Sequence, residues 1–132
     1  MTNEVMTIRQ MCDAYDVTPR TLRFYEAKEL LFPIREGQKR LFTRRDRARL
    51  KLILRGKRFG FPLEHIRQLL ELYSEADGGK KQLEGTLTAY KARKNDLEQQ
   101  IEDLQQVLGE LDEQMEWAQS TLDGTIARDD AN

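Results

Sequence analysis

The sequence predicts a mainly α-helical protein, in which a small winged helix-turn-helix domain precedes one long helix. Helix-capping signals mark four short amphipathic segments within the first 75 residues. A stretch with one proline and one glycine, residues 30–43, interrupts these segments. From residue 83 to residue 122, apolar side chains recur at alternating spacings of four and three, the pattern of a coiled coil.

The charge of the chain changes sign along its length. The whole chain has 22 Lys and Arg and 23 Asp and Glu, for a formal charge of −1. Residues 1–74 carry 16 basic and 9 acidic side chains (+7), and residues 75–132 carry 6 and 14 (−8). A basic half favours a polyanionic partner. Its basic side chains are densest at residues 35–58, which favours contact with phosphate.

The composition also narrows the class of protein. The single cysteine, Cys12, allows no disulfide within the chain and no site built on a pair of cysteines. No apolar run is long enough to span a bilayer, and the N-terminus lacks the regions of a signal peptide. We therefore expect a soluble, cytoplasmic protein without membrane contact. The sequence holds no nucleophile–base pair and no phosphate-binding glycine loop, so an enzyme is not expected.

The first two predicted helices form a helix-turn-helix pattern. Thr7 opens a capping box, and the apolar spacing that follows predicts a helix at residues 8–15. After a short turn, Thr18 is a suitable N-cap and Pro19 suits the first position of a helix. The second helix is therefore predicted at residues 19–28.

The second helix carries side chains suited to the major groove of DNA. Leu22 and one of the two aromatic residues after it are predicted to face the core, which turns the basic side chains outward. Arginine can bind guanine or phosphate, and hydroxyl groups can reach backbone oxygens. An ordinary surface helix with a solvated basic face explains the same pattern equally well. The groove-facing candidates are Arg20, Thr21, Arg23 and Tyr25.

A small hairpin, or wing, is predicted between the second and third helices. Pro33 cannot donate to a ladder, which suits an edge strand at residues 30–35. After a turn containing glycine, residues 39–43 can return as a second strand. Lys39 and Arg40 would then lie near the tip. A plain basic loop is the equally good alternative.

Two further helices complete the predicted N-terminal domain, expected at residues 1–75. Thr43 and Asp46 open the third helix, Leu50 and Ile53 supply its core side, and Gly60 ends it. A polar break with two glycines follows the fourth helix, so a linker is expected at 76–79. The fourth helix begins at Phe61-Pro62, and its apolar stripe is Leu63, Ile66, Leu69, Leu70 and Tyr73.

Residues 80–122 are predicted to form a dimerisation helix, with a short polar tail at 123–132. Only Lys94 interrupts the heptad pattern. A helix of this length cannot bury a narrow apolar stripe on so small a core, so a partner helix is required, and a second copy of the chain is the simplest partner. The predicted dimer contacts are Leu87, Tyr90, Leu97, Ile101, Leu104, Leu108, Leu111 and Met115.

The motifs at 6–8, 17–26, 30–33, 40–42, Asp46 and 60–70, taken in order with the long helix, resemble the MerR family of bacterial transcription regulators. The resemblance covers residues 5 to about 120. It implies a homodimer with an antiparallel coiled coil that binds a pseudo-palindrome in double-stranded promoter DNA. Distortion of that DNA would act on RNA polymerase indirectly. The implied DNA contacts are Thr18, Arg20, Thr21, Arg23 and Tyr25, Lys39 and Arg40 of the wing, and Lys57 and Arg58 of a second wing.

The resemblance also bears on what the protein senses. Metal-sensing relatives carry cysteines at the start of the dimer helix and in a loop after it, and this chain has none in either place. A short member that senses no metal and holds no cofactor is therefore expected, similar in shape to members that control catabolic operons. A small-molecule effector is left open and unidentified. The alternative function is a coiled-coil adaptor whose basic domain binds an acidic protein.

Overall fold

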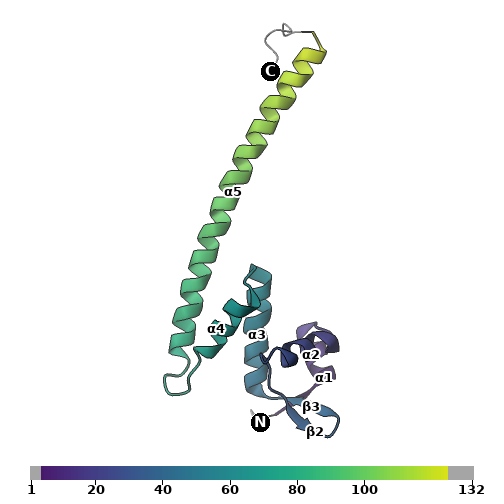
Figure 1. Ribbon diagram of the computed structural model, residues 1–132, viewed down its shortest axis with the longest axis vertical. Coiled ribbons are helices and arrows are strands. Elements are labelled where there is room, and N and C mark those ends of the chain that lie inside the picture. Colours follow the sequence, from purple (N-terminus) through teal and green to yellow (C-terminus); the bar gives the residue numbers. More distant parts are fainter. Residues whose placement is uncertain (1–3, 125–132) are drawn as a thin grey trace. The chain divides into compact units, whose positions relative to one another are not determined.

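The computed structural model describes residues 4–124, which form a helix-turn-helix, a wing, two more helices and one long helix (Figure 1). The order agrees with the prediction, and the bounds of the helices lie within a residue or two of those expected. The elements are β1 (Met6–Thr7), α1 (Ile8–Tyr15), α2 (Pro19–Ala27), β2 (Ile34–Glu36), β3 (Lys39–Phe42), α3 (Arg44–Phe59), α4 (Leu63–Glu71) and α5 (Lys80–Leu122).

The short helices begin and end where local chemistry places their caps. Thr7 and Gln10 form the predicted capping box, since the Gln10 N–H donates to the Thr7 hydroxyl at 3.2 Å and the Thr7 N–H donates to Gln10 Oε1 at 2.9 Å. Asp16, with a positive φ of 56°, ends α1. Thr18 caps α2, and Pro19 occupies its first position. The turn between the helices is therefore fixed by sequence-local hydrogen bonds.

The wing is the edge of a three-stranded antiparallel sheet with the order β1-β3-β2. Arg35 pairs with Arg40 across the hairpin, and Gly37 takes a positive φ in the turn. The predicted hairpin is thus confirmed. The third strand, β1, was not predicted, because its two residues are too few to produce a recognisable alternation.

The edge strand predicted at residues 30–35 is wrong in its first four residues. Leu30 and Leu31 are consecutive and both fully buried, whereas a strand would direct them to opposite faces. Their N–H groups both donate to the carbonyl of Tyr25 at the end of α2. The Phe32 N–H donates to the carboxylate of Asp46 at 2.9 Å. The donors of this segment are therefore already used, and the strand starts only after Pro33.

The core of the N-terminal unit is completed where α3 packs on α4. Leu50 and Ile53 of α3 and Ile66 of α4 are fully buried, as is Phe42 of β3. Gly56 lies at the crossing, because a Cβ built on it would lie 2.7 Å from Ile66 Cγ1. Gly56 thus allows the two helices to approach closely, a role that the sequence did not reveal.

The predicted apolar stripe of the fourth helix holds only in part. Ile66, Leu69 and Leu70 are buried, but α4 ends at Glu71 and Tyr73 lies beyond it with 38% of its surface exposed. The segment that follows turns back through two glycines with positive φ into α5. Tyr73 is therefore a surface residue of this connection.

The described residues divide into two compact units that meet within α5, between Thr86 and Leu87. The domain boundaries expected at residues 75 and 80 stay a prediction.

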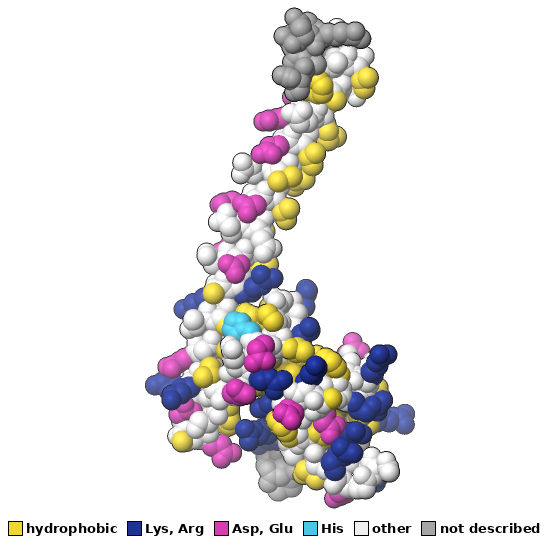
Figure 2. Space-filling model, in the orientation of Figure 1, with side chains coloured by type: hydrophobic (Ala, Val, Ile, Leu, Met, Phe, Trp, Pro, Cys, Tyr) yellow, Lys and Arg dark blue, Asp and Glu magenta, His cyan; other side chains and the backbone are white. Residues whose placement is uncertain are grey.

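The long helix α5 has 43 residues, which corresponds to a length of about 65 Å. Figure 2 shows a row of hydrophobic side chains along this helix. Among residues 4–124, no helix combines the length and the apolar character needed to cross a membrane.

Candidate nucleic-acid interface

Helix α2 presents two arginines to the outside. Leu22 is fully buried and holds the other side of the helix against the core. Arg20 and Arg23 are exposed, as the apolar spacing predicted. Two guanidinium groups within one turn of an anchored helix can bind phosphate or the edge of a guanine.

The two threonines of the candidate set are tied to each other. Thr18 Oγ1 accepts from the Thr21 N–H at 3.1 Å, and the two hydroxyl oxygens lie 2.9 Å apart in a second hydrogen bond. Both side chains therefore stabilise the start of α2. Contact with DNA through either hydroxyl would be additional to this capping role.

Tyr25 supports α2 from the inside. It keeps only 6% of its surface exposed, and burial raises the pKa of its hydroxyl. The sequence left open whether Phe24 or Tyr25 turns inward, and the structure selects Tyr25, while Phe24 stays exposed. Tyr25 therefore has little accessible surface with which to make the predicted DNA contact.

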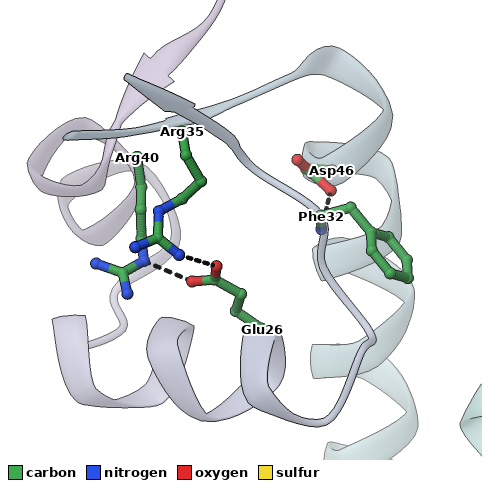
Figure 3. A network of polar contacts seen from close by, with 5 residues as sticks. All are labelled: Glu26, Phe32, Arg35, Arg40 and Asp46. Carbon is green, nitrogen blue, oxygen red and sulfur yellow. Dashed lines mark hydrogen bonds and ion pairs between the residues drawn. The ribbon is translucent and has the colours of Figure 1, made fainter. Parts of the chain in front are cut away.

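The wing is joined to α2 by a carboxylate that the sequence analysis missed. Glu26 lies between two arginines of the hairpin (Figure 3). Arg35 Nη1 donates to Glu26 Oε2 at 3.1 Å, and Arg40 Nε donates to Glu26 Oε1. Arg40, predicted as a DNA contact, therefore has an internal partner, whereas Lys39 beside it is exposed. In the sequence, the one sign of this role was that Glu26 is an acidic residue within a basic segment.

Several arginines of the basic half serve the fold. The Arg49 Nε–H donates to the Leu30 carbonyl at 2.7 Å, and Arg67 donates to the carbonyls of Lys28 and Glu29. Cations are favourable at the C-terminal end of a helix such as α2, where carbonyls lack helical partners. The density of basic residues at 35–58 therefore overstates the charge available to phosphate.

Lys57 and Arg58 lie in the last turn of α3 and are exposed. Gly60 ends the helix directly after them in the left-handed conformation, with φ of 92°. Both cations complement the dipole of α3 at this end. Their exposure also leaves both cations accessible to phosphate, as the predicted second wing requires.

Two family models match the chain and together cover most of it. The model described as "MerR HTH family regulatory protein" matches residues 6–73, and the model described as "MerR, DNA binding" matches residues 47–114. Each spans more than half of the chain. The chain belongs to the MerR family. The observed fold agrees, with an N-terminal helix-turn-helix, a small antiparallel wing and a long C-terminal helix.

Individual relatives support this placement. The HTH-type transcriptional regulator ZntR of Escherichia coli K12 is 40% identical over 67 residues, which are 49% of this chain and 48% of ZntR. The chain thus matches about half the length of the curated relatives. A MerR family transcriptional regulator from Bacillus cereus has a similar structure, with a TM-score of 0.64 and 28% identity, over 87% of this chain and 83% of the other.

A third likeness concerns the fold alone. HiNmlR, a MerR family regulator lacking the sensor domain and solved bound to promoter DNA, has a TM-score of 0.58 at 24% identity, over 92% of both chains.

Within the described residues of the present chain, no group of three His, Cys, Asp or Glu side chains is placed to hold a metal ion.

Proposed function

We propose that this MerR-family chain is a transcriptional regulator that binds promoter DNA as a homodimer. The observation that carries the proposal is the exposed pair Arg20 and Arg23 on α2, a helix held in place from behind by Leu22 and Tyr25. Lys39 of the wing and Lys57 and Arg58 of α3 add cations for phosphate contact.

The proposed dimer forms through α5. Leu97, Ile101, Leu104, Leu108, Leu111 and Met115 are all exposed in the single chain. Such a continuous apolar stripe is unfavourable in water and is covered most simply by a second copy. Following the family, we propose antiparallel pairing, which would place two α2 helices on one pseudo-palindrome.

We further propose that regulation acts through the shape of the DNA. A HiNmlR structure of the same fold was solved on promoter DNA, which supports a promoter as the target. Distortion of the promoter can align its elements for RNA polymerase without a direct protein contact. Bending would be measured from the mobility of fragments that carry the site at different positions, and a mobility independent of position would contradict this step.

The test of DNA binding is selection of bound fragments from a random duplex pool at near-physiological salt. We expect enrichment of an inverted repeat, with an affinity at least about a thousandfold above that for random DNA. Affinity for the repeat should fall steeply as salt rises, because the contacts release counterions. A difference below about tenfold between selected and random DNA would contradict the proposal and favour an adaptor that binds an acidic protein.

A further inference from the structure

A basic pocket lies in the N-terminal unit beside the first turns of α3. Its volume is about 440 Å³, within the range of small-molecule sites. None of its lining residues belongs to the DNA-contacting set proposed above. The polar and aromatic side chains that line it are Arg44, Arg45 and Arg49 of α3, Tyr73 and Glu75 after α4, and Gln82 of α5.

The charge of the lining is strongly positive. Three guanidinium groups share the pocket with a single carboxylate, that of Glu75. In the part of the chain that the structure describes, no ion pair joins Arg44, Arg45 or Arg49 to a carboxylate. A hollow lined by three guanidinium groups and one carboxylate keeps an excess of positive charge, and such a hollow concentrates anions.

Arg49 is fixed in position but keeps most of its donors. Its Nε–H donates to the Leu30 carbonyl at 2.7 Å, and its guanidinium lies over the Phe32 ring at 5.1 Å. The bond uses one of the five N–H donors of the group. Burial lowers the pKa of Arg49 and the neighbouring charge of Arg45 lowers it further, whereas the carboxylates of Asp46 and Glu71 act in the opposite direction. A bound anion would offset both effects.

The pocket also has apolar surface. The guanidinium of Arg45 lies over the ring of Tyr73 at 5.8 Å, which orients both side chains. Leu70, which is buried, also lines the pocket. Gln82 donates to the Leu69 carbonyl at 3.2 Å, so this wall is held by α4. The pocket thus places a guanidinium group, which can donate two parallel hydrogen bonds, next to the partly exposed ring of Tyr73.

We propose that this pocket binds a small organic anion, whose carboxylate or phosphate is held by the arginines and whose apolar part lies against Tyr73. Guanidinium groups form paired hydrogen bonds with both kinds of anion. Glu75 at the same pocket disfavours a ligand with many negative charges. The proposal does not rest on DNA binding.

The test is a calorimetric titration of the full chain with phenyl phosphate, alongside phenol and inorganic phosphate. We expect saturable binding of phenyl phosphate with one site per chain, tighter than either partial analogue. Arg45→Gln should weaken it by about tenfold or more, because charged hydrogen bonds are lost. The matched control is Arg55→Gln, an exposed arginine of the same helix outside the pocket, which should bind like the unmodified chain. Circular dichroism would establish that both variants are folded.

Three results would overturn the proposal. No saturable heat at millimolar phenyl phosphate would mean that the pocket holds no such ligand. An equal loss in Arg45→Gln and Arg55→Gln would mean that surface charge alone attracts the anion. Unchanged phenyl phosphate binding in Arg45→Gln would mean that the anion binds outside this pocket.

Discussion

Glu26 of α2 and Arg40 of the wing form an ion pair between the two elements proposed to contact DNA, and Arg35 binds the second oxygen of the same carboxylate. Both Glu26 and Arg40 are mostly buried, so this pair is less screened than a surface pair. One carboxylate of α2 therefore joins both strands of the hairpin to this helix. A phosphate group near Arg40 would have to compete with Glu26.

Replacing Glu26 by glutamine tests this competition. Glu26→Gln removes one negative charge and releases two arginines, so affinity for random duplex DNA should rise by roughly threefold. The ratio of specific to random affinity should fall, because the ion pairs between the wing and α2 are lost. The free energy of unfolding should fall by about 1 kcal/mol. Fluorescence titrations with both kinds of DNA and urea denaturation measure these effects.

Glu29→Gln is the matched control for the preceding variant. Glu29 is exposed just after α2, and Arg35 and Arg40 of the wing pair with Glu26 instead, so replacing Glu29 removes a negative charge without breaking a contact to the wing. It should raise affinity for both kinds of DNA equally. If the two variants had the same specificity ratio, Glu26 would have no positioning role.

The sequence was sufficient for those features that depend on neighbouring residues. Thr7, Thr18 and Thr43 cap the helices as predicted, because each hydroxyl needs only a backbone N–H three residues later. The heptad stripe likewise predicted the length of α5, since its period is visible in the sequence. The position of the exposed arginines on α2 followed from the apolar residue between them.

Contacts between distant residues could not be predicted in this way. Asp46 was recognised as a helix cap, but it also accepts from the Phe32 N–H fourteen residues away. Arg49 and Arg67 were indistinguishable from solvated cations until the carbonyls after α2 were located beside them. The strand predicted at residues 30–35 failed over residues 30–33 for the same reason, because the backbone donors there are used by other contacts.

Arg23→Ala should weaken binding to the selected site by about 1–3 kcal/mol if Arg23 contacts a base, with relaxed preference at one position. The measurement is competition between the selected site and single-base variants at fixed salt. Arg55→Ala, which removes an exposed arginine outside the proposed interface, is the control and should change little. If affinity fell equally for all DNA sequences, and the slope of log affinity against log salt fell by about one, Arg23 would instead be a phosphate contact.

Leu104→Asp should dissociate the proposed dimer. The Leu104 side chain is 62% exposed in the single chain and lies within the apolar stripe, so the substitution would bury a charge in the interface. Sedimentation velocity measures the change in mass. Gln106→Asp adds the same charge about 200° around the helix and should leave the dimer intact. A Leu104→Asp variant that still sediments as a dimer would place the interface on another surface.

The same substitution should have opposite effects at two helical glycines. In Gly56→Ala, the new methyl group would lie 2.7 Å from buried Ile66, so overpacking of about 1–3 kcal/mol should exceed the gain of about 1 kcal/mol in helix propensity.

A Cβ added at Gly109 of α5 would meet no atom of the described chain within 4 Å apart from the adjoining residues and the backbone of the helix itself, so Gly109→Ala should stabilise the protein by up to about 1 kcal/mol. Urea denaturation at matched protein concentrations compares the two variants, since a dimer's stability depends on concentration. Unchanged stability of Gly56→Ala would mean that Ile66 moves aside without cost. A destabilised Gly109→Ala would mean that a partner helix approaches the backbone at Gly109, and the stripe would then extend around to that face.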